Sequence, residues 1–204
     1  MDERFACIRM VEMMKMEKKI ILASNSPRRR QLLEGLGIPF EVKTIDGIDE
    51  SYPDNLPPEK IAEYIANEKA QAYVITPDEL LITADTIVVC DGEILGKPHD
   101  EADARRMLKS ISGKTHKVIT GVCLLTAERK TLFSVVTDVT FKRLTDAEIS
   151  YYISNYAPYD KAGAYGIQEW IGYVGVTSIS GSYFNVMGLP VQRIYEEIKR
   201  IDPS

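Results

Sequence analysis

Three consecutive arginines, Arg28 to Arg30, stand in the segment SNSPRRRQLLEGLG at residues 24–37. Ser26 is suited to cap a helix and Pro27 to open it, so the arginines fall in the first helical turn. Cations are unfavourable there, because the helix N-terminus already carries positive partial charge. Either the arginines point outward to surface carboxylates, or an anion such as a phosphate binds at this turn. The candidate phosphate-binding residues are Ser24, Ser26, Arg28 and Arg29.

One carboxylate interrupts an apolar segment. Asp85 lies within LLITADTIVVC at residues 80–90, which otherwise predicts a buried strand. A buried carboxylate costs several kcal/mol unless it is paired or binds a metal. It is either a structural aspartate near a strand end or a catalytic carboxylate facing a cleft, and we favour the second. Thr86 points to the opposite face of a regular strand, so we expect a β-bulge if both residues reach one pocket.

Further charged residues suit work on a polyanion. Asp46, Asp49 and Glu50 lie in one predicted loop, where carboxylates held together repel each other unless a cation sits among them. Mg²⁺ is typically held by one or two carboxylates plus substrate phosphates. Lys69 lies on a predicted helix and Lys97 follows a predicted hairpin, although a solvated surface role is the default for any single lysine.

Other residue patterns are less specific. His99 and His116 lack metal-ligand spacing, so we expect solvated or capping roles for both. Gln168 closes the glycine-containing stretch GAYGIQ, which is either an ordinary loop or a loop that contacts a nucleobase. Its amide carries both a donor and an acceptor, which suits a base edge. Neither a Walker phosphate loop nor a G-x-S-x-G nucleophile motif occurs in the sequence.

The elements that must position these residues alternate irregularly between strands and helices. We predict strands at 19–23, 40–45, 80–90, 93–98, 116–125, 132–144 and 172–179. We predict helices at 27–37, 58–73, 100–113, 145–155 and 190–201, with Asp100 as a cap and Thr145 and Glu148 as a capping box. This order favours an α/β fold with a mixed sheet and flanking helices over strict βαβ repetition.

Composition excludes several classes of protein. Lys plus Arg number 25 and Asp plus Glu 30, so the net charge of −5 argues against a dedicated nucleic-acid binder. No apolar run reaches the roughly 18 residues that a membrane helix needs. Three unpatterned cysteines, Cys7, Cys90 and Cys123, fit a reducing cytoplasm. Residues 1–18 predict a peripheral leader without the pattern of a secretory signal.

Several motifs, taken together, resemble the Maf family of nucleoside triphosphate pyrophosphatases. These motifs are SNSPRRRQLL, ADTIVV, GEILGKP, SGKTHKVITGV, DKAGAYGIQ and NVMGLP, and they occur in the family's order between about residues 19 and 198. The resemblance implies a single two-lobed domain over 19–204, with a strongly twisted mixed sheet and a cleft between the lobes, related to the inosine triphosphatase group. It also implies a homodimer and a divalent metal cofactor, Mg²⁺ or Mn²⁺.

The resemblance further implies hydrolysis of a nucleoside triphosphate between the α and β phosphates, giving a monophosphate and pyrophosphate. Asp85 corresponds to the family's proton acceptor, and Glu50, Lys69 and Lys97 fall where the family has its other charged catalytic residues. Asp49 is the alternative to Glu50. Glu50 and Asp85 are the expected metal ligands.

The substrate is expected from three further positions. The family's dTTP- and UTP-hydrolysing subfamily has Arg, Thr and Gln where this sequence has Arg28, Thr86 and Gln168. The sister subfamily, which acts on 7-methyl-GTP, typically has Trp, Gln and Glu there. Two rivals are a non-catalytic nucleotide-binding regulator of cell division or septum formation and a nucleic-acid-binding module built on the arginine cluster.

Overall fold

The computed structural model describes residues 17–202, and its centre is a seven-stranded mixed sheet. The strand order is β2, β1, β3, β5, β6, β7, with β4 paired to part of β3. β1 is parallel to β2 and β3, and the other pairs are antiparallel. The predicted α/β class is confirmed. The strands are β1 (Lys19–Leu22), β2 (Phe40–Val42), β3 (Glu79–Cys90), β4 (Glu93–Leu95), β5 (Thr115–Leu125), β6 (Lys130–Phe141) and β7 (Val176–Ser180).

Three of the predicted helices begin at capping side chains that the sequence indicated. Ser26 accepts from the backbone N–H of Arg29, Asp100 accepts from that of Asp103, and Thr145 forms the predicted capping box. The helices are α2 (Pro27–Glu34), α3 (Pro58–Gln71), α4 (Glu101–Ile111), α5 (Asp146–Tyr156), α6 (Trp170–Gly175), α7 (Tyr183–Met187) and α8 (Val191–Ile201), with 3₁₀ turns η1 (Pro158–Asp160) and η2 (Ala162–Ala164).

The predicted strand at 172–179 is wrong over its first half. The short helix α6 covers that part, and β7 begins only at Val176. Two glycines explain the difference, because both permit close packing: a Cβ on Gly172 would lie 1.8 Å from the carbonyl oxygen of Ile167, and one on Gly175 would lie 2.8 Å from the ring of Phe141. The helix α7, capped by Ser182, was also not predicted.

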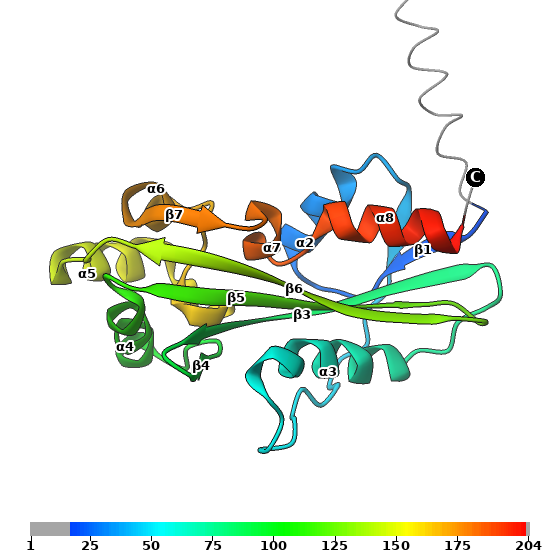
Figure 1. The fold of residues 1–204 in the computed structure, drawn as a ribbon, viewed down its shortest axis with the longest axis horizontal. Coiled ribbons are helices and arrows are strands. Elements are labelled where there is room, and N and C mark those ends of the chain that lie inside the picture. The colour runs from blue at the N-terminus through cyan, green and yellow to red at the C-terminus, as the bar shows by residue number, and fades with distance from the viewer. Residues whose placement is uncertain (1–16, 203–204) are drawn as a thin grey trace, which may run out of the picture.

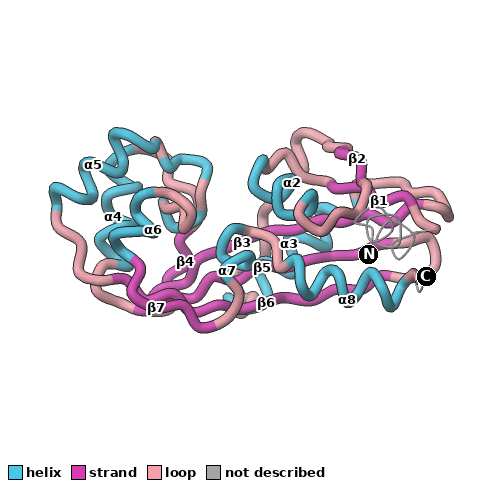
Figure 2. Tube along the Cα trace, turned by 90° about the horizontal axis from the view of Figure 1, so that it is seen from above, coloured by secondary structure: helices cyan, strands magenta, loops and turns pink. Residues whose placement is uncertain are grey.

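The helices gather at two ends of the sheet. Figure 2 shows β3, β5 and β6 running between these ends, with α4, α5 and α6 at one and α2, β1 and β2 at the other. In Figure 1, α8 lies on one side of the long strands and α3 on the other. We propose that the two ends are the lobes of one domain. The predicted leader at 1–18 lies almost wholly outside the described residues.

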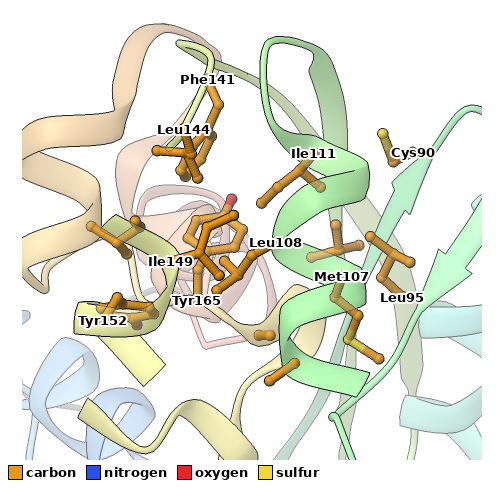
Figure 3. Close-up of a cluster of buried hydrophobic side chains, with 14 of the residues drawn as sticks. Cys90, Leu95, Met107, Leu108, Ile111, Phe141, Leu144, Ile149, Tyr152 and Tyr165 are labelled. Atoms are coloured by element: carbon orange, nitrogen blue, oxygen red, sulfur yellow. The ribbon is translucent and has the colours of Figure 1, made fainter. Parts of the chain in front are cut away.

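One lobe has its own apolar core beneath α4 and α5. Leu108 and Ile111 of α4 are fully buried, and Figure 3 shows them directed toward the centre of the cluster, where the Tyr165 ring lies. Tyr165 also meets Phe141 edge-on, with ring centroids 5.1 Å apart. Burying each large apolar side chain stabilises the fold by about 1.5–3 kcal/mol, so this core anchors the loop between α5 and α6 that carries Tyr165.

The other lobe buries β1 and the start of β3 on both faces. In β1, Ile20 and Leu22 pack in the cluster that includes residues of α2 and α8, whereas Ile21 packs in the cluster that includes residues of α3. This explains the continuous apolar runs of β1 and β3 in the sequence. No helix within residues 17–202 combines the length and the apolar character that a membrane crossing requires.

One edge of β3 is only partly paired. β1 pairs with it as far as Ile82, and β4 pairs with it from Val88 onward. β5 covers the opposite edge from Leu81 to Val89 without a register shift. Residues 83–87 therefore form an open edge between the two lobes, and Asp85 lies at its middle.

Candidate active site

A cavity of about 500 Å³ lies at this open edge, between the lobes. Its lining draws on the α2 turn, the loop before α3, the middle of β3, the loop after β4, and the loop between α5 and α6. The cavity reaches both faces of the sheet, because no strand covers the edge there. The structure thus brings these separate predicted site residues to one cavity: Ser24, Ser26, Arg28, Arg29, Glu50, Lys69, Asp85, Thr86, Lys97 and Gln168.

Two carboxylates share one lysine. Lys69 Nζ lies 2.8 Å from Asp85 Oδ1 and 2.8 Å from Glu50 Oε1. The side chains of Lys69 and Asp85 are only 13% and 14% exposed, whereas that of Glu50 is 49% exposed. Asp85 is therefore the shielded member of the pair, and Glu50 lies toward solvent.

The loop before α3 separates the two candidate carboxylates. Asp49 accepts hydrogen bonds from the backbone and hydroxyl of Ser51, at 2.9 and 2.8 Å. Glu50 instead turns to Lys69 and lines the cavity. Burial raises the pKa of Glu50, but the hydrogen bond and charge of Lys69, together with the charge of Lys97, outweigh it and lower that pKa below its ordinary value.

Asp85 and Thr86 reach the cavity without the expected β-bulge. The β3–β5 register is regular, so the two side chains lie on opposite faces of the sheet. Both still line the cavity, because the open edge lets it extend around the strand. The Thr86 hydroxyl accepts from Arg29 Nη2 at 3.1 Å and lies 3.0 Å from the hydroxyl of Thr120.

Arg29 ties three elements together. Its Nε donates to Gly188 O at 2.8 Å and its Nη1 to Ala84 O at 2.7 Å, in addition to the bond to Thr86. Burial lowers the pKa of Arg29, with the Asp85 charge opposing that effect. Three of its donors serve this junction, and the guanidinium still lines the cavity.

The start of α2 is organised by the predicted serines. Ser24 Oγ accepts from the backbone of Ser26 at 3.2 Å, and Ser26 Oγ accepts from the backbone of Arg29 at 3.4 Å. Arg28 reaches across the cavity, where its Nη1 lies 2.8 Å from Asp160 Oδ2. Arg30 is exposed. The three consecutive arginines therefore differ in their surroundings: Arg29 lies at the junction, Arg28 reaches across the cavity, and Arg30 points to solvent.

Gln168 and Lys97 stand on the second lobe. Gln168 Oε1 is buried and accepts no hydrogen bond from the residues described. An orphaned buried acceptor is costly, so this atom is suited to a donor that a ligand supplies. Lys97 is exposed at the cavity. The two loops are joined because the backbone N–H of Gly163 donates to the carbonyl of Gly96 at 3.0 Å.

A divalent cation fits this site only with help from a ligand. Residues 17–202 contain no group of three or more His, Cys, Asp or Glu side chains that could hold a metal. Glu50 and Asp85 each have one oxygen on Lys69, which leaves the second oxygen of each carboxylate for a cation. Two carboxylate donors suit Mg²⁺ or Mn²⁺ that also binds substrate phosphates.

The sequence did not point to three cavity neighbours. Lys161 is 7% exposed and lines the cavity, and Tyr152 and Glu169 stand behind it in a hydrogen-bonded chain. The Asp-Lys pair before a glycine-containing stretch is the only signal that could have suggested them. His116, expected in a solvated or capping role, is instead 2% exposed and bonds Tyr165.

The fold and the site define a class of protein: an α/β protein whose sheet edge opens on a cavity that sets lysines and arginines against carboxylates. Such a cavity suits a polyanionic ligand. A family model described as "Maf-like protein" matches residues 19–201. The chain belongs to the Maf family, which confirms the resemblance of its motifs.

Relatives of high identity carry one name. A protein from Phocaeicola vulgatus named dTTP/UTP pyrophosphatase is 66% identical over 185 residues, which cover 90% of this chain and 96% of the relative. Proteins of the same name from Bacteroides thetaiotaomicron and Porphyromonas gingivalis are 56% and 53% identical, covering 90% and 91% of this chain and 96% of each relative. A solved nucleoside-triphosphatase / dITP/XTP pyrophosphatase from Mycobacterium abscessus is 14% identical with a TM-score of 0.42, covering 90% of this chain and 96% of that one.

Proposed function

We propose that this protein hydrolyses dTTP and UTP, or modified pyrimidine nucleotides, to the monophosphate and pyrophosphate. One observation carries the proposal: the partly buried Asp85 lies in the same cavity as Lys69, Arg28 and Lys97. A triphosphate carries about four negative charges, which such a set of cations can hold. The shared name of the relatives supports the choice of nucleotide.

In this proposal Asp85 accepts a proton from the attacking water. The water oxygen forms a bond to the α-phosphorus, the bridging bond to the β-phosphate breaks, and pyrophosphate leaves with that bridging oxygen. Lys69 orients the Asp85 carboxylate through their 2.8 Å contact. A positioned general base contributes a factor of about 10²–10⁴ to such a rate.

The cations and the α2 turn position the triphosphate. Arg28, Lys69 and Lys97 lie around the cavity, and the backbone N–H groups at the start of α2 add positive partial charge. Arg29 contributes through the junction that it holds, with its charge close to the cavity. Fixed cations of this kind stabilise charge that develops on the leaving group without reorganising during the step.

A divalent metal, Mg²⁺ or Mn²⁺, is the proposed cofactor, with Glu50 and Asp85 as its protein ligands. When bound, the metal neutralises charge on the phosphate oxygens. Glu50 suits this role because its lowered pKa keeps it ionised and its side chain is half-exposed. Lys69 holds both carboxylates in place.

Selection of the base is proposed for the Gln168 loop. The buried Oε1 can accept the N3–H of uracil or thymine, and the amide nitrogen can donate to a neighbouring carbonyl. Thr86 contributes indirectly, since its hydroxyl is engaged by Arg29 and Thr120. A hydrogen-bonding site discriminates strongly, because a wrong base leaves buried polar groups unpaired.

The deciding experiment is hydrolysis of a nucleotide panel in ¹⁸O-labelled water, with Mg²⁺, Mn²⁺ or EDTA. We expect pyrophosphate release from dTTP and UTP well above that from GTP, no turnover in EDTA, and the label in the monophosphate. Label in pyrophosphate or release of orthophosphate contradicts attack at the α-phosphorus. Binding without hydrolysis under all conditions supports the regulator instead.

Compartment, oligomeric state and partners complete the proposed function. We propose a cytoplasmic protein that acts as a homodimer on a free nucleotide, with no nucleic-acid or membrane partner. The net charge of −5 supports the absence of a nucleic-acid partner. Light scattering after size exclusion tests the dimer, and a salt-dependent filter-binding titration tests nucleic-acid binding.

A further inference from the structure

A continuous polar chain joins α2 to the loop between α5 and α6. Arg28 Nη1 lies 2.8 Å from Asp160 Oδ2, and Lys161 Nζ lies 2.7 Å from Asp160 Oδ1 and 3.0 Å from Glu169 Oε1. The Tyr152 hydroxyl donates a short hydrogen bond to Glu169 Oε2. We call Tyr152, Asp160, Lys161 and Glu169 the loop network.

The charges of the loop network balance once Arg28 is counted with it. Lys161 is matched by Glu169 on one side and by Asp160 on the other, and Asp160 also neutralises Arg28. The Lys161 side chain is 8% exposed, and an ammonium so buried is costly unless it is paired. The positive charge of Lys161 is therefore neutralised by carboxylates of the protein itself. At the cavity Lys161 fixes the position of its neighbours, whereas an exposed lysine would offer its charge to a phosphate.

The loop network contacts the backbone that leads to Gln168. Tyr152 OH accepts from the backbone N–H of Gly166 at 2.9 Å. A Cβ on Gly166 would lie 2.8 Å from Glu169 Cδ and 3.0 Å from Lys161 Cε, so the network packs directly against this backbone. Only one residue, Ile167, separates Gly166 from Gln168.

The same loop holds an unfavourable backbone conformation. Gly163 and Ala164 have φ of 69° and 59°, and a residue with a Cβ, such as Ala164, seldom adopts that region. Such a conformation persists only where surrounding contacts hold it. The backbone N–H of Gly163 donates to Gly96 O at 3.0 Å, and that of Ala164 donates to Lys161 O at 3.1 Å. The next residue, Tyr165, is held by its hydroxyl, which lies 2.8 Å from His116 Nε2.

We propose that the loop network is a positioning unit for base selection, which sets the Gly166–Gln168 backbone and the Arg28 guanidinium relative to one another. The inference rests on the proposed function, because it explains how the nucleotide would be selected. Gln168 Oε1 has no protein partner among the residues described. Its value as an acceptor therefore depends on where the backbone places it, and a small displacement weakens a bond to the base.

Two conservative variants test this role. Tyr152→Phe keeps the stacked ring beside Tyr156 but leaves the Gly166 N–H without its acceptor. Glu169→Gln keeps an oxygen acceptor but removes the charge that faces Lys161. We expect the ratio of kcat/KM for UTP to that for GTP to fall by about tenfold to a hundredfold in each, as for small misplacements in other sites. The KM for UTP should rise more than kcat falls.

Glu197→Gln is the matched control. Glu197 is a buried carboxylate on α8, 2.6 Å from both Arg193 and Arg200, and it does not line the cavity. This variant removes comparable ion pairing, so its Tm should fall while the UTP-to-GTP ratio stays at the parent value. A merely structural role for the network predicts the same behaviour in Tyr152→Phe and Glu169→Gln.

The results of these variants test the inference separately from the proposed function. The inference is overturned, and the proposed function kept, if the parent is selective and either folded variant, Tyr152→Phe or Glu169→Gln, keeps the parent's UTP-to-GTP ratio of kcat/KM. An equal loss of selectivity in Glu197→Gln also overturns it. A parent that hydrolyses UTP and GTP equally contradicts the proposed selectivity itself, and the inference falls with it.

Discussion

Lys69 Nζ lies 2.8 Å from Asp85 Oδ1, although a helix supplies one residue and a strand the other. The contact depends on a glycine in the neighbouring strand, because Gly121 of β5 stands directly opposite Asp85. A Cβ on Gly121 would lie 2.2 Å from the backbone carbon of Ala62 and 2.2 Å from the nitrogen of Glu63. The helix α3 therefore rests on the bare backbone of β5, which brings its lysine to the carboxylate.

The first prediction concerns this close approach. Gly121→Ala must push α3 away from the sheet, since the obstructing atoms are backbone. We expect a loss of about 1–3 kcal/mol in the free energy of unfolding, as for other overpacked cores, and a fall in turnover. Urea denaturation measures the first and pyrophosphate release the second. Gly96→Ala, whose added Cβ meets no atom within 4 Å, should leave stability unchanged.

The second prediction removes the proposed base. Asp85→Asn keeps the size of the side chain and an oxygen that can accept from Lys69, so the fold should persist. Turnover of dTTP and UTP should fall by about 10²–10⁴, the usual contribution of a general base. Circular dichroism checks the fold and pyrophosphate release the rate. A variant that turns over at the parent rate removes Asp85 from this role.

The sequence predicted the parts of the site that break a local rule. An aspartate in an apolar strand and arginines in a helical first turn are unfavourable by themselves, so each predicted a compensating partner. For Asp85 the partner is Lys69, and for Arg28 it is Asp160. Both partners come from distant parts of the chain, and no local spacing specifies such pairs.

The sequence failed where tertiary packing decides the outcome. The Thr86 side chain reaches the cavity through the open edge of β3, and a gap between two pairing strands has no local signature. Residues 172–175 were predicted to begin a strand but form a helix, in which Gly172 packs closely against Ile167. His116 gives no sign in the sequence that β5 buries it beside Tyr165.

The third prediction follows from that burial. Burial lowers the pKa of His116 from 6.5 to about 4, with Asp138 opposing the shift. As the pH falls below 6.5 the unfolded chain binds this proton first, so the free energy of unfolding decreases until about pH 4. The full difference amounts to about 3 kcal/mol.

Urea denaturation at pH 7 and at pH 4 measures this effect. Between pH 7 and pH 4, the free energy of unfolding of His116→Gln should fall by about 3 kcal/mol less than that of the parent, because the titrating group is gone. His99→Gln is the control, since His99 is exposed, and it should keep the parent's pH dependence. If the free energy of unfolding falls equally in His116→Gln and in the parent, His116 is not a buried neutral imidazole.

The last prediction concerns the acceptor without a protein partner. Gln168→Glu replaces an amide by a carboxylate at the buried end of the side chain, where a charge is unfavourable and the N–H donors are lost. We expect kcat/KM for dTTP and UTP to fall by about 10²-fold or more, as when a site loses hydrogen bonds to its substrate, with a much smaller relative change in Tm. Gln192→Glu adds the same charge on an exposed part of α8 and should alter neither quantity much. A rate that falls only in step with the folded fraction would show that Gln168 supports the loop without reading the base.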